Sequence, residues 1–258
     1  MRKISQILLC VIVLLFAADV MAGPLMIFDS GAECDGAIDT ETVLLVHGDI
    51  AAGTTAFVDS SANGLAITTV GNAAQTKVFR KIGPEAVQFT SGADSLTLAD
   101  SAYFTFGSGA FTIDFWVRMT GTIYANIFDH GSGGDGNYNN CFIRDNYVQF
   151  NANNAVTGRS ITLRSSDTVA KAFVLNEWFH IAIIRGWGGN ADMMVLTING
   201  KSTDSYDVSG WTDPGDPTTV FEIGNPSSNQ YQIDEFRVTK GKALWTTDFT
   251  PPRKEVCN

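Results

Sequence analysis

The feature that most constrains the fold of this chain is a two-residue alternation of apolar and polar side chains in short runs. The run FTIDFWVRM (111–119) sets Phe, Ile, Phe and Val against Thr, Asp, Trp and Arg, which is the period of a half-buried β-strand. Further short runs rich in strand-forming residues lie at 43–47, 65–70, 86–89, 95–98, 178–186, 193–201 and 220–225. Since no long amphipathic helix accompanies them, we predict an all-β protein built as an antiparallel sandwich or barrel.

Turn-forming residues separate these runs. Asn199-Gly200, between MMVLTI and KSTDSYDV, is the strongest hairpin signal, because a type I′ turn needs a positive φ at both central residues. No linker or shift in composition divides the chain. We therefore expect one β domain over 41–252, preceded by an extension at 23–40 and followed by a tail at 253–258.

The first 22 residues have the composition of a secretory signal peptide. Arg2 and Lys3 precede an apolar core at 7–18, and Ala22 ends a short run suited to cleavage. The apolar core is shorter than the roughly 20 residues that span a bilayer. We therefore predict a secreted protein that has no membrane span once residues 1–22 are removed.

The charge of the chain limits its partners. Lys and Arg number 17 against 27 Asp and Glu, which gives a formal net charge of −10 at pH 7. No cluster of basic residues interrupts this acidic excess. Such a chain repels phosphate backbones, so we do not expect it to bind nucleic acid.

The cysteines predict one disulfide. Cys10 falls within the predicted signal peptide, which leaves Cys34, Cys141 and Cys257, and an odd count leaves one thiol over. Cys34 and Cys257 lie near opposite ends of the mature chain, and domain termini are often close in space, so we predict that these two pair. Cys141 is followed by apolar residues, and we expect it to be a buried thiol.

Several motifs follow one another in an order that is typical of a known family. They are VLLVHGD, FVDSSANG, FTIDFWVRM, WFHIAIIRG, LTINGK, FEIGN and YQIDEFRVTKGKALWTTDFTPP. From 43 to 252 the chain resembles the laminin G-like domains of the concanavalin A-like lectin/glucanase superfamily, as found in bacterial secreted proteins and phage tail proteins. The resemblance implies a two-sheet antiparallel jelly roll with one concave sheet and adjacent first and last strands. IDEFRV would be the closing strand, and a bridge from Cys34 to Cys257 would fit that geometry.

The same superfamily includes glycoside hydrolases, whose catalysis requires a pair of carboxylates. A retaining enzyme needs two carboxylates about 5 to 5.5 Å apart, and an inverting one roughly 6.5 to 9.5 Å. The retaining glucanases of this fold carry Glu-x-Asp-x-x-Glu or a near variant on one strand, whereas the comparable strand here offers only Asp114. Alternation would place Asp234 and Glu235 on opposite faces of the closing strand, and we expect Glu235 to pair with Arg237. We therefore predict that the protein is not an enzyme.

The resemblance also implies a structural calcium ion. Members of the family often hold one with an acidic or amide residue of a loop and an acidic residue of a closing strand. The turn VDSSANG (58–64) offers the oxygen donors that Ca²⁺ prefers. The implied ligands are Asp59, Asn63 and Asp234. The alternative is that Asp59 and Asn63 only form an Asx turn.

Polar and aromatic residues that suit a sugar gather in the run FDHGSGGDGNYNN (128–140), which we predict to be a loop. Sugar hydroxyls bond to amides and carboxylates, and the C–H face of a sugar packs on an aromatic ring. The candidate ligand-binding residues are Asp129, His130, Asp135, Asn137, Tyr138 and Asn139, with Trp187 and Trp211 from two other loops.

These features together predict a secreted, non-catalytic module that binds carbohydrate or a glycosylated surface. Two alternatives stay open. The first is a structural or adhesive protein–protein unit of a cell-surface appendage, a matrix or a virus-like particle, which includes self-assembly. The second, less favoured because the carboxylate pair is missing, is a glycoside hydrolase.

Overall fold

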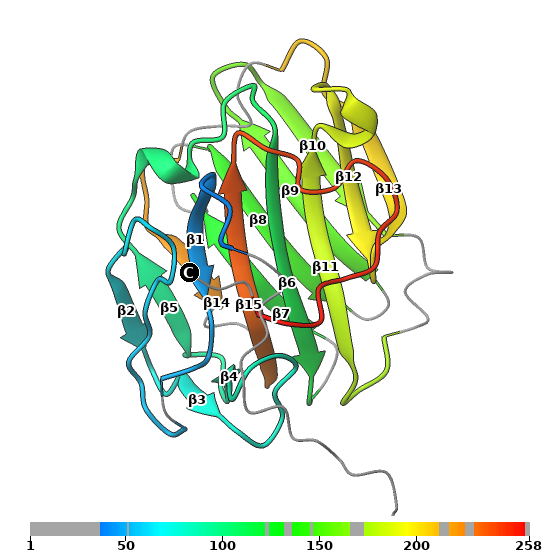
Figure 1. Cartoon of the computed structure of the whole chain (residues 1–258). Coiled ribbons are helices and arrows are strands. Elements are labelled where there is room, and N and C mark those ends of the chain that lie inside the picture. The colour runs from blue at the N-terminus through cyan, green and yellow to red at the C-terminus, as the bar shows by residue number, and fades with distance from the viewer. Residues whose placement is uncertain are drawn as a thin grey trace, which may run out of the picture. The chain divides into compact units, whose positions relative to one another are not determined.

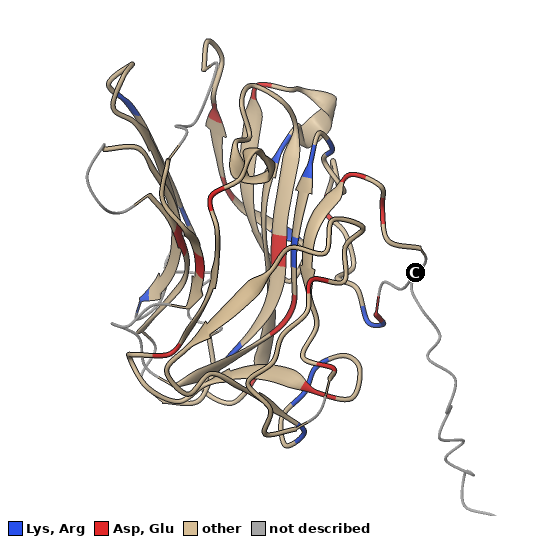
Figure 2. Ribbon diagram, turned by 90° about the vertical axis from the view of Figure 1, so that its left-hand side faces the viewer, with Lys and Arg blue, Asp and Glu red and all other residues tan. Residues whose placement is uncertain are grey.

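In the computed structural model of the chain, the described residues are 37–50, 52–121, 124–131, 136–144, 147–165, 173–211, 217–224 and 230–255. These residues form fifteen strands and two short 3₁₀ helices, η1 (Ala102–Phe104) and η2 (Trp187–Gly189). The strands make two antiparallel sheets that stack face to face, as Figures 1 and 2 show from the front and from the side. The predicted all-β antiparallel sandwich is therefore confirmed.

The front sheet in Figure 1 has eight strands, with β6 and β15 near its centre. On β6, Phe115 points into the core, whereas Asp114 and Trp116 lie on the outer face, as the alternation of the sequence predicts. The hydrogen-bonded order is β13 (Lys201–Asp207), β12 (Met193–Ile198), β11 (Trp178–Arg185), β6 (Phe111–Met119), β15 (Tyr231–Lys240), β4 (Ala86–Phe89) and β3 (Ala74–Thr76), and β1 (Thr42–Val46) also pairs with β15.

The rear sheet has seven strands. Their order is β10 (Arg159–Arg164), β9 (Tyr147–Asn154), β8 (Tyr138–Arg144), β7 (Tyr124–His130), β14 (Phe221–Gly224), β5 (Ser95–Leu98) and β2 (Ile67–Val70). The sequence indicated no strand at β7 to β10. The predicted loop at 128–140 is wrong at both ends, because β7 continues to His130 and β8 begins at Tyr138.

Aromatic rings fill the space between the two sheets. Phe115 stacks on Phe236 with 5.6 Å between ring centroids, and Phe128 stacks on Phe221 at 5.7 Å. Such ring pairs contribute about 0.5–1.5 kcal/mol beyond the area they bury. Cys141 lies in the same core as a free thiol, and burial raises the pKa of that thiol. The prediction of a buried Cys141 is therefore confirmed.

The β12–β13 hairpin has the predicted turn. Asn199 has a φ of 51° and Gly200 a φ of 74°, so both central residues occupy the left-handed region that a type I′ turn requires. Gly200 is further constrained because a Cβ there would collide with the carbonyl oxygen of Phe249. The turn is therefore also where the C-terminal segment contacts the sheet.

The first and last strands lie in the same sheet. β1 pairs with β15, with Val46 opposite Phe236, so the adjacent first and last strands implied by the family resemblance are confirmed. The predicted signal peptide and both Cys34 and Cys257 lie outside the described residues. Within the described ranges, no helix is long and apolar enough to cross a membrane.

Candidate functional site

The outer face of the eight-stranded sheet is crossed by a C-terminal strap, residues 241–255 (Figure 1). Leu244 donates its N–H to Thr112 Oγ1 of β6 at 3.0 Å, and Phe249 donates its N–H to the carbonyl of Gly200 at 2.9 Å. The strap is thus bonded both to the centre of the sheet and to its β12–β13 side. These bonds hold the strap over much of the outer face.

Aromatic side chains of the strap pack on this face. The rings of Trp245 and Phe249 are stacked, with centroids 3.9 Å apart and an interplanar angle of 3°. The ring of His180 lies edge-on to both, with centroids 5.7 Å from each, and Trp116 contacts His180 at 5.1 Å. Because these rings cover one another, they serve packing rather than presenting a free aromatic surface.

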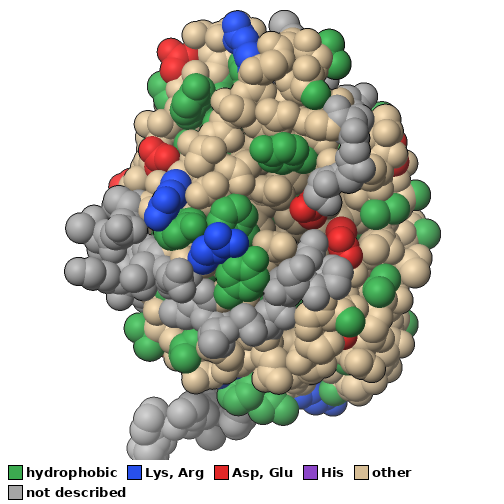
Figure 3. All heavy atoms as spheres, turned by 180° about the vertical axis from the view of Figure 1, so that it is seen from behind, with side chains coloured by type: hydrophobic (Ala, Val, Ile, Leu, Met, Phe, Trp, Pro, Cys, Tyr) green, Lys and Arg blue, Asp and Glu red, His purple; other side chains and the backbone are tan. Residues whose placement is uncertain are grey.

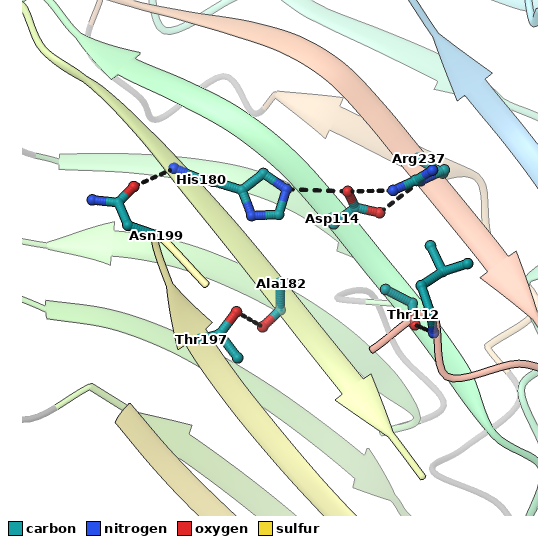
Figure 4. A network of polar contacts seen from close by, with 8 residues as sticks. Thr112, Asp114, His180, Ala182, Thr197, Asn199 and Arg237 are labelled. Carbon is teal, nitrogen blue, oxygen red and sulfur yellow. Dashed lines mark hydrogen bonds and ion pairs between the residues drawn. The ribbon is translucent and has the colours of Figure 1, made fainter. Parts of the chain in front are cut away.

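A buried ion pair lies beneath the strap (Figure 4). Arg237 donates two hydrogen bonds to Asp114, both 2.9 Å long, and His180 Nε2 lies 3.2 Å from Asp114 Oδ2. Burial would raise the pKa of Asp114, but the positive charge of Arg237 holds this pKa below its ordinary value. Burial lowers the pKa of His180. Arg237 therefore pairs with Asp114 and not, as the sequence predicted, with Glu235.

A β-bulge interrupts β15 between Asp234 and Arg237, and Glu235 within it has a φ of 53°. Asp234 lies opposite Trp116, whose side chain is on the outer face. Glu235 forms an ion pair with His47 and lines a hollow on the same outer face. The prediction that alternation places the two acids on opposite faces is wrong, because a bulge adds a residue and breaks the alternation.

A hollow of about 560 Å³ runs along the strap. Arg237 and Trp245 line it, and the guanidinium of Arg237 lies over the Trp245 ring, 5.5 Å from its centroid. Both side chains also hold the strap against the sheet. We therefore regard the hollow as a seam between strap and sheet.

The outer face of the seven-stranded sheet has a different composition. Along β8 and β9, buried residues alternate with partly exposed ones, and cross-strand neighbours share a face. The side chains on the outer face are Tyr138, Asn140, Phe142 and Arg144 of β8, Tyr147, Gln149, Asn151 and Asn153 of β9, and Thr162 and Arg164 of β10. We call these residues the polar face.

Hydrogen bonds join the amides of the polar face across three strands. Asn151 donates to Asn140 Oδ1 at 2.9 Å and accepts hydrogen bonds from Gln149 at 2.8 Å and from the Thr162 hydroxyl at 3.0 Å. These bonds fix the orientation of each amide before any ligand arrives. A preorganised polar surface loses less conformational entropy on binding than a flexible one.

Basic and aromatic side chains adjoin the amides. The guanidinium carbon of Arg164 lies 3.6 Å from the ring centroid of Tyr147. That of Arg144 lies 4.9 Å from the Tyr124 centroid and 5.4 Å from the Phe142 centroid. Figure 3 views this side of the molecule and shows basic side chains against hydrophobic ones near its middle. A stacked guanidinium keeps its N–H groups available at its edge.

Two carboxylates lie on the other side of the amides. Asp129 of β7 is opposite Asn140 on one neighbouring strand and opposite Glu222 of β14 on the other. Asp129 is only 9% exposed. The outer face of this sheet therefore has acidic side chains on one side of the amides and basic and aromatic side chains on the other.

Some of the predicted ligand-binding residues lie on or beside this face. Tyr138 is part of the polar face, Asp129 lies beside it but is only 9% exposed, and Asn137 lies at its edge, where its side-chain oxygen accepts the N–H of Ala155 at 2.9 Å. Asp135 lies outside the described residues. These positions are close together, as the sequence suggested, although two of them are on strands.

Other predicted residues lie elsewhere. His130, Asn139 and Trp211 are buried. Trp187 packs against Ala182, Ile184 and Val195, the cluster on which Trp245 and Phe249 of the strap also pack. We leave these four out of the candidate site. The residues that sequence reasoning missed are on β8 to β10, and the available signal was the alternation of YNNCFIR and YVQFNANN.

The implied calcium ligands do not fit a calcium site. The Asp59 carboxylate already accepts four hydrogen bonds, from the N–H groups of Leu45, Ser61 and Leu65 and from the Ser61 hydroxyl, at 2.8 to 3.0 Å. Asn63 donates its amide to the carbonyl of Val43 at 3.1 Å. These bonds fasten the 58–64 turn to β1, which is the Asx-turn alternative, and both carboxylate oxygens of Asp59 are occupied by them.

The comparisons with known proteins agree with the architecture. Residues 90–245 match the family described as the concanavalin A-like lectin/glucanases superfamily. No curated protein matches the chain in sequence.

Solved structures of similar fold include toxin binding domains. The binding domain of Paraclostridial Mosquitocidal Protein 1 has a TM-score of 0.63 and 16% identity, and the match covers 81% of this chain and 51% of that one. The receptor binding domain of botulinum neurotoxin D has a TM-score of 0.61 and 15% identity, over 80% and 50%. The serotype D ligand binding domain in complex with N-acetylneuraminic acid has a TM-score of 0.61 and 16% identity, over 80% and 49%. The chain thus spans about half the length of these structures, and such low identities show a shared fold alone.

Proposed function

Because the chain belongs to the concanavalin A-like lectin/glucanase superfamily, we propose that it is a secreted, non-catalytic module that binds carbohydrate or a glycosylated surface through the polar face. The observation that carries this proposal is the set of hydrogen-bonded amides flanked by stacked Arg144 and Arg164. Amides and guanidinium groups bond to sugar hydroxyls, and an aromatic ring packs on sugar C–H groups.

The toxin domains support this proposal by analogy. One of them is a receptor binding domain, and another is a ligand binding domain solved with N-acetylneuraminic acid, a sugar that carries a carboxylate. On the polar face, Arg144 and Arg164 are the groups that would pair with such a carboxylate. A ligand with an acidic sugar is therefore the first class to test.

A glycoside hydrolase is the alternative that the face itself raises, because Asp129 and Glu222 are directly opposite each other on adjacent strands. Opposed residues on a sheet have the short spacing that a retaining enzyme uses. Asp129, however, is only 9% exposed, so a glycosidic oxygen would not reach it. Turnover of polysaccharides or chromogenic glycosides that Glu222→Gln abolishes would favour the hydrolase over our proposal.

A structural or adhesive role is the second alternative. Its supporting observation is the exposure of two apolar side chains on one loop, Val78 at 74% and Phe79 at 45%. Light scattering of the purified chain tests it. A concentration-dependent oligomer that Val78→Asp or Phe79→Asp dissociates would favour the adhesive role.

A glycan array read with the wild-type chain tests the proposed function. We expect binding that falls at least tenfold in Asn151→Ala and Arg164→Ala. The matched control is Thr68→Ala, which removes an exposed side chain from β2 at the far edge of the same sheet. Binding that survives both changes, or that the control reduces equally, would refute the assignment of the polar face.

A structural calcium ion stays a prediction without a fitting ligand set. The side chains of Asp59 and Asn63 form hydrogen bonds with the backbone of β1 that hold the 58–64 turn. Asp234 accepts hydrogen bonds from the N–H groups of Lys81 and Ile82 through one oxygen only. We derive no role for calcium in carbohydrate binding from these residues.

A further inference from the structure

Three strands of the eight-stranded sheet meet at the bulge of β15. β4 pairs with β15 up to Ile233, and β1 pairs with it from Phe236 onward. The bulge lies between these two pairings, so β15 has no ladder partner on that side there. His47, the first residue after β1, reaches this gap through its ion pair with Glu235.

Side chains with metal-binding atoms converge at this point. One ligand atom each from His47, Asp49 and Glu235 lie within 4.8 Å of one another. Two of the three residues are partly buried and Glu235 is buried. The convergence depends on the bulge, because Glu235 reaches His47 from a left-handed backbone conformation that a regular strand does not contain.

A second carboxylate beside the cluster lacks a partner. Asp234 is 1% exposed, and its Oδ2 accepts the N–H groups of Lys81 and Ile82 at 2.8 and 2.9 Å. Its Oδ1 is buried and has no hydrogen-bond partner among the described residues. Asp234 directly precedes Glu235 at the bulge of β15, so this unpaired oxygen belongs to the same stretch of strand that supplies a ligand atom to the cluster.

The loop before β4 holds these groups together. Its residues Lys81 and Ile82 bond to Asp234, and Glu85 donates its N–H to Asp49 Oδ1 at 3.0 Å. Gly83 lies between them, and a Cβ there would collide with Asp49 Oδ2 and with Glu255 of the strap. One loop therefore fixes two carboxylates while leaving one oxygen of Asp234 unpaired in a buried position.

We propose that His47, Asp49 and Glu235 bind one divalent transition-metal ion of the zinc class, with Asp234 beside it. An imidazole nitrogen with carboxylate oxygens is a donor set that Zn²⁺ and its neighbours accept, whereas Ca²⁺ takes oxygen donors almost alone. The ion would join β1, β15 and the loop before β4. Its ligands differ from those of the calcium ion implied by the family, which would be Asp59, Asn63 and Asp234.

The competing explanation is a plain ion pair between His47 and Glu235. A protonated imidazole would satisfy Glu235, and no metal would then be needed. It would leave the buried Oδ1 of Asp234 without a hydrogen-bond partner among the described residues, and it would not account for the third ligand atom, from Asp49, at the same point. A divalent ion compensates all of these groups at once, which is why we favour it.

Titration of the untagged, chelator-stripped full chain with ZnCl₂ by calorimetry tests the proposal. We expect one bound ion per chain, a rise in the melting temperature with Zn²⁺, and little effect of CaCl₂. His47→Gln and Glu235→Gln should weaken Zn²⁺ binding at least tenfold. Glu177→Gln, which changes an exposed carboxylate without a partner among the described side chains, is the matched control.

Crystals of the wild-type chain soaked in ZnCl₂ provide a readout that does not depend on the folding of a variant. Anomalous scattering at the zinc edge should place a peak between His47 and Glu235. The proposal is overturned if millimolar Zn²⁺ does not bind the folded chain, if the peak lies elsewhere, or if His47→Gln binds Zn²⁺ as tightly as the wild type. Because the site lies on the other sheet, its loss would leave the test of the polar face unaffected.

Discussion

The outer faces of both sheets carry polar and charged side chains, but these are buried on one face and partly exposed on the other. On the eight-stranded sheet, Asp114, His180 and Arg237 bond to one another beneath the strap. On the seven-stranded sheet, the amides around Asn151 also bond to one another, but they are partly exposed. The difference lies in the covering segment: residues 241–255 turn one polar surface into part of the fold.

This comparison predicts that the two faces respond oppositely to mutation. Changes beneath the strap should reduce the free energy of unfolding, because they leave buried charge or empty space. Changes on the polar face should leave stability nearly intact and reduce binding. A single set of substitutions can therefore test whether the two faces differ in this way.

The largest effect is expected for Arg237→Ala, which leaves Asp114 buried without its bidentate partner. Breaking such a pair costs about 3–5 kcal/mol of unfolding free energy, measured by urea denaturation followed through tryptophan fluorescence. Arg80→Ala, which removes an exposed guanidinium, is the control. A loss below about 1 kcal/mol would show that the pair is not a structural element of this face.

The next effect is expected for Trp245→Ala in the strap. Removing a buried Trp side chain costs about 3–5 kcal/mol, so a partly buried one should cost about 2 kcal/mol. Amide hydrogen exchange at Leu244, bonded to Thr112, should accelerate as the strap loosens. Thr247→Ala, an exposed strap residue, should do neither, and equal effects from both would contradict the packing role of the stacked rings.

A smaller effect is expected from pH. Burial would raise the pKa of Asp114, but the charge of Arg237 lowers it below the value in the unfolded chain. The contribution of Asp114 to the free energy of unfolding is therefore present above the unfolded pKa and is lost as the pH falls. Burial lowers the pKa of His180, so its contribution is likewise lost as pH falls below the ordinary histidine range. These two groups should therefore lower the urea midpoint from pH 7 toward pH 4, whereas Asp49 and Asp234, whose pKa values burial raises, act in the opposite direction. His180→Phe should flatten the upper part of this decrease, and an unchanged slope would assign it to other groups.

The smallest effect on stability is expected for Arg164→Ala on the polar face. Its guanidinium is exposed and stacks on Tyr147, so the unfolding free energy should change by no more than about 0.5 kcal/mol. Binding to any glycan identified on the array should nevertheless fall at least tenfold. A loss of stability comparable to that of Arg237→Ala would erase the contrast between the faces.

The sequence predicted the strands of the eight-stranded sheet, which the strap covers, better than those that carry the polar face. β6 and β11 have apolar side chains and β-branched residues at a clear period of two, and the β12–β13 turn has the Asn-Gly pair that the hairpin requires. β8 and β9 alternate just as strictly, but their outward positions are rich in Asn and Gln. Asn is depleted in strands on average, so these strands resembled a loop.

Two features of the eight-stranded sheet could not be predicted from a single sequence. The bulge at Glu235 inserts one residue without a glycine to mark it, and the gap it opens comes from the pairing of β1 and β4 with the same strand. The pairing of Arg237 with Asp114 likewise depends on which strands are neighbours. Tertiary neighbours, rather than local pattern, determine these contacts.

The most direct test of the account is to observe which face a bound glycan contacts. Side-chain amide signals of Asn140, Gln149 and Asn151 can be followed by ¹⁵N NMR during titration with the strongest glycan of the array. We expect these signals to shift in a saturable way, while the indole signal of Trp245 in the strap stays in place. Shifts confined to Trp245 and its neighbours, or no saturable shift with any glycan, would contradict the assignment of the seven-stranded sheet as the binding face.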